Sequence, residues 1–121
     1  MKKWLALFFL LPSVALAAPG QLVDCQTSPQ SITTGGTDQT QLAVGSQNTT
    51  VWVENYCSAT TQNIGSAESL WVNVGAAAAV GTGFELAACG SQVFQLNYPN
   101  QQALHVYAAT TSHRFACKVN Q

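Results

Sequence analysis

The sequence predicts an all-β protein, an antiparallel β-sandwich or jelly-roll-like domain of about seven to eight short strands with two disulfides. Short runs of alternating apolar and polar residues recur at intervals of roughly 8–12 residues, a spacing typical of sandwiches and barrels. Gly, Pro and Asn separate these runs, and four cysteines are distributed along the chain. Beyond the N-terminal leader, no segment has the periodicity of a helix.

The first part of the domain contains its strongest strand signal, TTVWVENY at residues 49–56. In this segment Val51 and Val53 point to one face, whereas Trp52 and Glu54 point to the other. A Gly-Gly pair and other turn-forming residues interrupt the chain before it. The β-prone segments predicted here are residues 21–26, 32–34, 39–44 and 49–56.

The second part repeats the same alternation. Leu70 and Val72 share one face of a predicted strand, and Trp71 lies on the other. The alanine run at residues 76–79 is too short to nucleate a helix, and glycines follow it, so we interpret it as a close-packed loop. The predicted strands here are residues 69–75, 84–86, 92–97, 104–108 and 115–119.

The N-terminus has the features of a secretory signal. Two lysines precede the apolar run WLALFFLL, and Ala15 and Ala17 supply the small residues that a signal peptidase requires. The apolar run is well short of the roughly 20 residues that span a bilayer. We therefore predict a signal peptide at residues 1–18, a single domain at residues 19–121, and no stable membrane span after cleavage.

The charge of the mature chain argues against a nucleic-acid partner. Arg114 and Lys118 are its only strong cations, against five acids, which gives a net charge of −3. Neutralising phosphates requires clustered Lys and Arg, so nucleic-acid binding is disfavoured. The surface instead relies on uncharged hydrogen-bonding residues, as expected for a secreted or periplasmic β protein.

All four cysteines lie in the exported part, and an even count in such a chain predicts disulfides. Their separations do not resemble the close pairs that bind zinc. We favour Cys57–Cys89, because the two residues would end and open neighbouring antiparallel strands, together with Cys25–Cys117, which would join the ends of the domain. The alternative, Cys25–Cys57 with Cys89–Cys117, stays open.

No motif predicts catalysis, a metal or a cofactor. The sequence has no GxSxG nucleophile elbow. His105 occupies an outward position of a strand and His113 a turn, so we expect both to be solvent-exposed polar residues. Two carboxylates in one cleft would be needed for glycoside hydrolysis, and nothing brings Glu54, Glu68 or Glu85 together.

The aromatic residues are more informative. Trp52 and Trp71 each lie opposite the apolar face of their strand, and Tyr98 lies in a turn. Tryptophan is highly buried on average, so each Trp could pack beneath a loop. Exposed, the same residues would form a platform for a glycan or a partner protein. We take Trp52, Trp71 and Tyr98 as candidate binding residues.

Four segments in order resemble a class of small bacteriophage virion proteins, β-sandwich modules of heads, tails or fibres. The family carries an "IxN" strand, "SLYVNFG", "GxxLAPGxSxxF" and "ALYVIAATxGxxF". The matching positions here are Asn55 and residues 69–75, 86–94 and 103–115. Ala88-Cys89 replaces the Pro-Gly-like turn of the family, whose members mostly lack a signal peptide and disulfides. The resemblance assigns no catalytic residues.

The resemblance and the leader together predict a secreted structural or binding module, a phage-type virion component that acts in assembly or host-surface attachment. Its partners would be other virion or surface proteins or a cell-surface glycan, and an oligomer is compatible with this role. A bacterial secreted carbohydrate- or protein-binding module is the alternative. A small secreted hydrolase or inhibitor ranks third.

Overall fold

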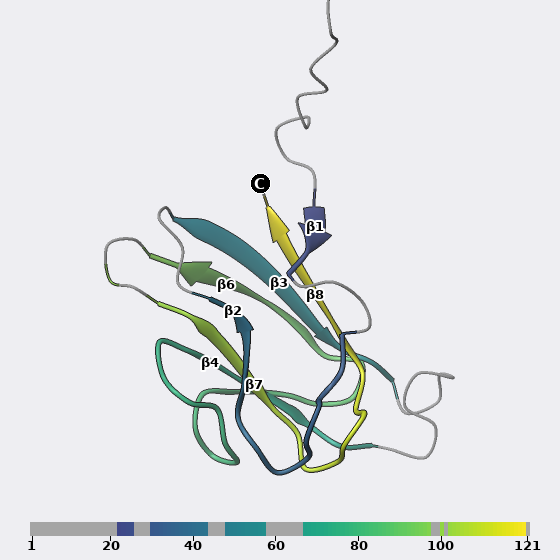
Figure 1. Ribbon diagram of the computed structural model, residues 1–121. Coiled ribbons are helices and arrows are strands. Elements are labelled where there is room, and N and C mark those ends of the chain that lie inside the picture. Colours follow the sequence, from purple (N-terminus) through teal and green to yellow (C-terminus); the bar gives the residue numbers. More distant parts are fainter. Residues whose placement is uncertain are drawn as a thin grey trace, which may run out of the picture.

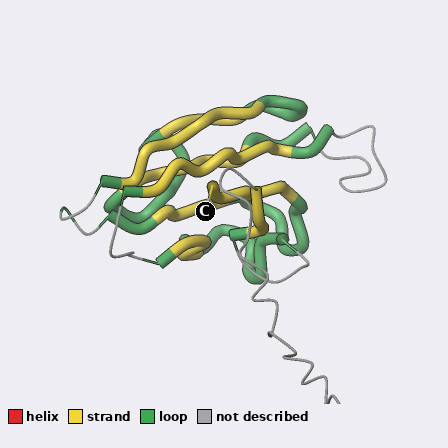
Figure 2. The backbone as a smooth tube through the Cα atoms, turned by 90° about the horizontal axis from the view of Figure 1, so that it is seen from above, coloured by secondary structure: helices red, strands yellow, loops and turns green. Residues whose placement is uncertain are grey.

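Eight strands, with no helix, make up the part of the chain that the computed structural model describes: residues 22–25, 30–43, 48–57, 67–97, 100 and 102–120. Figure 2 shows that strands and loops alone form this part. The predicted signal peptide and Tyr98 lie outside the described residues. The strands are β1 (Leu22–Asp24), β2 (Gln39–Leu42), β3 (Thr49–Asn55), β4 (Leu70–Val74), β5 (Phe84–Leu86), β6 (Ser91–Leu96), β7 (Leu104–Tyr107) and β8 (Phe115–Asn120).

The strands form two four-stranded antiparallel sheets (Figure 1). Sheet 1 has the order β1-β8-β3-β6, and sheet 2 has the order β2-β7-β4-β5. The pairs β1–β8, β2–β7, β3–β6 and β4–β5 are nested, as if one long hairpin had been rolled up. This is the jelly-roll arrangement of two interlocked Greek keys, so the predicted fold class is confirmed.

The core lies between the sheets and is built from the inward residue of each alternating pair. Val51 and Val53 of β3, and Leu70 and Val72 of β4, are fully buried, as the alternation predicted. The remaining members of this core are Ile32, Leu86, Phe94, Leu96, Leu104, Val106, Ala108, Phe115, Cys117 and Val119.

One predicted β-prone segment, residues 32–34, is not a strand. The Ile32 N–H donates to the carbonyl of His113 (2.9 Å), and the Ser112 N–H donates to the carbonyl of Ile32 (2.8 Å). These bonds tie a loop to the turn before β8 and satisfy its backbone. The Ile32 side chain is buried among the core residues, which explains the apolar residue in an otherwise polar segment.

Both favoured disulfides are present, and both join strands of sheet 1. Cys25 follows β1 and is bonded to Cys117 of β8, with Cα atoms 5.4 Å apart. Cys57 follows β3 and is bonded to Cys89, which precedes β6, with Cα atoms 4.4 Å apart. The topological argument for these pairs is therefore confirmed. Two disulfides are typical of proteins that fold in an oxidising compartment.

The alanine run forms a loop, as predicted, but only part of it is close-packed. Ala78 is buried, whereas its neighbours at 76–77 and 80–83 are exposed. Gly83 returns the chain to the sheet with a φ of +86°. A Cβ atom there would lie 2.3 Å from the carbonyl oxygen of Val72, so only glycine fits this approach of β5 to β4.

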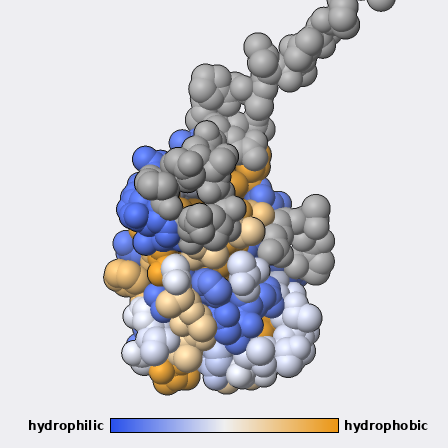
Figure 3. Space-filling model, turned by 60° about the vertical axis from the view of Figure 1, so that its left-hand side comes forward, coloured by the Kyte–Doolittle hydropathy of each residue, from blue (hydrophilic) through white to orange (hydrophobic). Residues whose placement is uncertain are grey.

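The described surface is mixed in character. On the face seen in Figure 3, hydrophobic residues occur as small separate groups among hydrophilic ones. Four large hydrophobic side chains are nevertheless well exposed: Leu22, Val80, Phe84 and Val93. Within the described ranges, no helix could serve as a membrane span.

Candidate functional site

The two candidate tryptophans lie on opposite sides of the sandwich. Trp52 alternates with the buried Val51 and Val53 and therefore points outward from sheet 1. Trp71 alternates with the buried residues of β4 and points outward from sheet 2. Both are half-buried. The structure does not bring them into one site, and each must be considered with the strands beside it.

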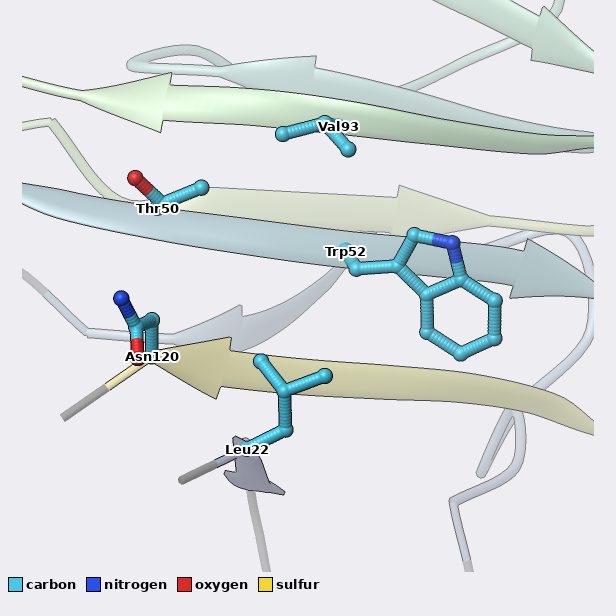
Figure 4. A pocket seen from close by; sticks show the side chains of 5 residues that line it. All are labelled: Leu22, Thr50, Trp52, Val93 and Asn120. Atoms are coloured by element: carbon cyan, nitrogen blue, oxygen red, sulfur yellow. The ribbon is translucent and has the colours of Figure 1, made fainter. Parts of the chain in front are cut away.

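Trp52 lies in an open groove of about 520 Å³ on the outer face of sheet 1. Figure 4 shows its ring between Val93 of β6 and Leu22 of β1. Trp52 is directly paired with Val93 across the β3–β6 ladder. Leu22 is 56 % exposed and Val93 49 % exposed, so three strands together present an apolar surface to solvent. We call this surface, with Thr50 and Asn120, the Trp52 groove.

The polar residues around the groove are mostly uncharged. Thr50 donates its hydroxyl hydrogen to Oε1 of Gln95 (3.0 Å). Asn120 lies opposite Leu22 on the neighbouring strand and lines the same groove. Next to Trp52 on its other side, Lys118 forms an ion pair with Asp24. The groove thus combines an aromatic ring with uncharged donors and acceptors. Beside it, Lys118 and Asp24 neutralise each other, and Glu54 lies two residues from Trp52 on the same face of β3.

A second, smaller hollow of about 160 Å³ lies further along the same sheet. Asp24 and Lys118 line it together with Tyr56 and Arg114, so its character is polar. Because the ion pair belongs to its wall and also flanks Trp52, the two hollows adjoin. The outer face of sheet 1 therefore changes from apolar to polar along the strands.

The outer face of sheet 2 is organised differently. Trp71 is paired with Tyr107 on one side and with Glu85 on the other. Two residues before Tyr107 on the same strand, Nδ1 of His105 lies 2.9 Å from Oδ2 of Asp38. The other Asp38 oxygen accepts the Ala78 N–H (2.7 Å), so the 75–83 loop is fastened over this face. His105 is therefore in contact with Asp38 and is not a free surface residue.

His113 is buried, and our expectation that it is solvent-exposed is wrong. It precedes β8, and its Nε2 lies 2.7 Å from Oδ1 of Asn55, a residue that is also fully buried. The Asn55 amide donates to the carbonyls of Glu68 (2.9 Å) and Leu86 (2.8 Å). Since those two bonds fix the amide orientation, Oδ1 must accept, and Nε2 of His113 carries the proton.

The other ring nitrogen of His113, Nδ1, lies 3.5 Å from Oε2 of Glu68. The Glu68 carboxylate is held in turn by the backbone N–H groups of Ala109 and Thr110. Burial lowers the pKa of His113 below its usual value, and the adjacent Glu68 offsets part of this effect. Asn55, Glu68 and His113 together form a buried polar group that joins the ends of β3, β4, β5 and β8. The His113 residue is only 3 % exposed, so its imidazole is out of reach of a substrate.

Among the described residues, no cluster of three or more His, Cys, Asp or Glu side chains could hold a metal ion. All described cysteines are in disulfides. The Trp52 groove has the volume and the mainly apolar lining of small-molecule sites, which range over roughly 300–1,000 Å³.

Sequence reasoning identified Trp52 but missed the residues around it. Leu22, Thr50, Val93 and Asn120 come from four strands, and only the order β1-β8-β3-β6 makes them neighbours. The signal in the sequence that could have found them is the alternation of side chains, because each occupies an outward position of its strand.

Comparisons of this chain with known proteins found no matching family model, no matching curated protein and no matching solved structure.

Proposed function

We propose that this protein is an exported, non-enzymatic binding module, a component of a phage-type virion that attaches to a glycan on the host surface through the Trp52 groove. The observation that carries this proposal is the open groove itself. Trp52 offers a flat apolar surface, and Thr50 and Asn120 lie beside it as uncharged hydrogen-bonding groups. A sugar ring has one apolar face and a rim of hydroxyls, which matches this combination.

The electrostatics of the groove favour a neutral ligand. Lys118, which is paired with Trp52 across the β3–β8 ladder, forms an ion pair with Asp24. A free carboxylate or ammonium in the wall would select a charged ligand, because such a partner forms the stronger charge-assisted bonds. Uncharged side chains at the described rim suit hydroxyl groups, which both donate and accept hydrogen bonds.

The virion assignment is supported by the architecture and by the sequence resemblance. Jelly rolls occur in viral capsid and lectin domains, but one fold hosts many functions. Among the segments that resemble phage virion proteins, Asn55 is the buried amide that holds the ends of three strands. Two disulfides suit a particle that is assembled through an oxidising compartment.

Glycan-array binding tests the attachment role. We expect the exported protein to bind a restricted set of neutral glycans and Trp52→Ala to weaken this binding by about tenfold or more, the order expected for a lost aromatic contact plus its buried area. Trp71→Ala, on the opposite sheet, is the matched control and should leave binding unchanged. If Trp71→Ala alone abolished binding, the groove would be the wrong site, and if no glycan bound, attachment to a glycan would be refuted.

Mass spectrometry of purified particles tests the virion role separately. We expect peptides from the mature chain to copurify with particles through a density gradient. Detection only in the cell envelope or culture fluid would refute the virion assignment and support a bacterial surface module. This result does not depend on the glycan array, so the two parts of the proposal can fail independently.

A further inference from the structure

The four edge strands of the sandwich differ in how well they are protected from pairing with another chain. Exposed edges invite such pairing, and natural proteins shorten them, bulge them or charge them. β1 has three residues and ends in the ion-paired Asp24. β2 has a register shift between Thr40 and Leu42. β5 has three residues with Glu85 at its centre. Each of these three carries at least one protective device.

β6 carries none of these devices. It is the longest edge strand, with the six uncharged residues SQVFQL and no proline. Its register with β3 is unbroken over six consecutive residue pairs. Among the described strands it pairs with β3 alone. β6 therefore presents a regular, neutral row of backbone groups on the side away from β3.

The hydrogen bonds at the start of β6 show which of its residues face outward along the edge. The Asn55 N–H donates to the Gly90 carbonyl (2.8 Å), and the Asn55 carbonyl accepts the Cys89 N–H (3.1 Å). Asn55 thus directs both backbone groups towards β6, and by alternation Val53 and Val51 do the same. Their partners in β6 are Gln92 and Phe94. It follows that the intervening residues, Ser91, Val93 and Gln95, direct their N–H and C=O groups to the edge. There the Val93 carbonyl accepts a bond from the side-chain amide of Gln92 (3.3 Å), which a pairing strand would replace.

From this geometry we infer that β6 pairs antiparallel with β6 of a second copy of this chain, about a two-fold axis at Val93. Only this register opposes all three outward-facing residues: Val93 with its own copy, and Ser91 with Gln95 of the other copy. Six backbone hydrogen bonds result, two from each opposed pair. The interface is isologous and closes as a dimer.

A second copy fits this edge better than an unrelated strand for two reasons. First, the strand is free of charge, so no like charges meet across the axis. Second, Val93 is the rim of the Trp52 groove and is directly paired with Trp52. Pairing at Val93 therefore aligns Trp52, Val93 and their copies in one cross-strand row and merges two exposed apolar grooves into one.

The dimer would contain one continuous eight-stranded sheet. With strands about 4.8 Å apart, three spacings separate the two Trp52 strands, a distance of about 14 Å. Six backbone bonds and one apolar row make a small interface, so we expect a weak dimer that is populated at high protein concentration. The inference concerns self-association and stands independently of whether the groove binds a glycan.

The oligomeric state of the exported protein tests the inference by sedimentation equilibrium. We expect a reversible monomer–dimer equilibrium and an increase in the dimer Kd of at least about tenfold in Val93→Lys, because like charges directly opposed across strands are destabilising. Val80→Lys is the matched control: Val80 is an even more exposed valine on the 75–83 loop, at 67 % against 49 % for Val93, and its exchange should leave the Kd unchanged. A protein that stays monomeric at every concentration would refute the inference.

Cross-linking tests the register. Opposed hydrogen-bonded residues have Cα atoms about 5.5 Å apart, which a disulfide can bridge. We expect Val93→Cys to form covalent dimers under mild oxidation and Ser91→Cys to remain monomeric, because two copies of residue 91 would be four residues apart, or about 13 Å. Equal cross-linking of both variants, or an unchanged dimer Kd in Val93→Lys, would refute pairing at Val93. Dimers that form in a protein that binds no glycan on the array would separate self-association from glycan binding.

Discussion

The two sheets of this jelly roll are held together by different means. Sheet 1 contains both disulfides, one between β1 and β8 and one between the ends of β3 and β6. Sheet 2 contains none. Its outer face is instead fastened by polar contacts, among them the Asp38–His105 pair and the bond from Ala78 to Asp38. The cross-linked sheet is the one that presents an open groove, and the polar sheet is the one that a loop partly covers.

Under the proposed binding role, this difference assigns the contact with another molecule to the outer face of sheet 1. Apolar side chains that stay exposed to solvent add little to the free energy of folding, so sheet 1 needs another source of stability. Covalent cross-links supply it without occupying the surface, and a preorganised site loses less entropy on binding. In sheet 2 the outward side chains are already engaged with each other and with the 75–83 loop. Their hydrogen-bonding capacity is therefore directed to stability.

Removing the cross-links of sheet 1 should have the largest effect on stability. In the chain-entropy account, loss of the Cys25–Cys117 disulfide, with a sequence separation of 92, costs about 4–5 kcal/mol. Loss of Cys57–Cys89, with a separation of 32, costs about 3.5–4 kcal/mol. The paired Cys→Ala variants can be compared by guanidinium unfolding. A larger loss from the shorter loop would contradict the entropic ranking.

The polar group at the end of the sandwich should come next. Asn55→Ala removes three hydrogen bonds from a fully buried amide and leaves its partners unsatisfied, which should cost about 3 kcal/mol. Asn73→Ala is the matched control on the outer face of sheet 2. Asn73 makes only local bonds, to Ala77 and Val74, and is half-exposed, so its loss should cost less than about 1 kcal/mol. Similar losses in urea unfolding would show that burial does not separate the two residues.

The strands and the disulfides could be predicted from the sequence because both depend on local pattern. Alternation in β3 and β4 determines which side chains face the core, and the core side chains there are the predicted ones. Cys57 and Cys89 lie at the ends of segments that could run antiparallel, which singled out their pairing. These inferences needed no knowledge of which strands are neighbours.

The groove and the buried polar group could not be predicted because they depend on strand order. Trp52 was identifiable, but its partners Leu22 and Asn120 lie on strands at the two ends of the chain. His113 follows a polar turn, and no local pattern distinguishes a histidine that is buried against Asn55 from one in solvent. The jelly-roll pairing creates both environments, and a single sequence does not specify that pairing.

The pH dependence of stability tests the interior of this polar group. Burial lowers the pKa of His113, so the folded state binds a proton less readily than the unfolded state, whose histidine pKa is near 6.5. The contribution of neutral His113 to the free energy of unfolding is therefore complete above about pH 6.5. It is lost as the pH falls from there through the pKa of His113 in the folded state. We expect the free energy of unfolding to fall below that pH with a slope of up to about 1.4 kcal/mol per pH unit.

His113→Gln should remove this slope, because glutamine can still donate to Oδ1 of Asn55 but does not titrate. Chemical denaturation of both proteins at several pH values between about 7.5 and 5 gives the measurement. The slope, rather than the absolute stability, is the readout, since the substitution also changes packing. An unchanged slope in His113→Gln would assign the acid sensitivity to other groups.

The smallest expected effect concerns the backbone at Cys89, which precedes the exposed strand β6. Cys89 has a φ of +68°, a left-handed conformation that favours glycine. Without the disulfide, in a Cys57→Ala background, Cys89→Gly should therefore be more stable than Cys89→Ala by about 1 kcal/mol. The same pair of substitutions at Cys25, in a Cys117→Ala background, is the control. Cys25 lacks a positive φ, so glycine should be the less stable choice there. Thermal unfolding gives the measurement. A glycine advantage at both positions would mean that flexibility rather than the left-handed turn explains the gain. Opposite signs would show that the Cys57–Cys89 bond holds sheet 1 together across a turn whose conformation is unfavourable for Cys89 itself.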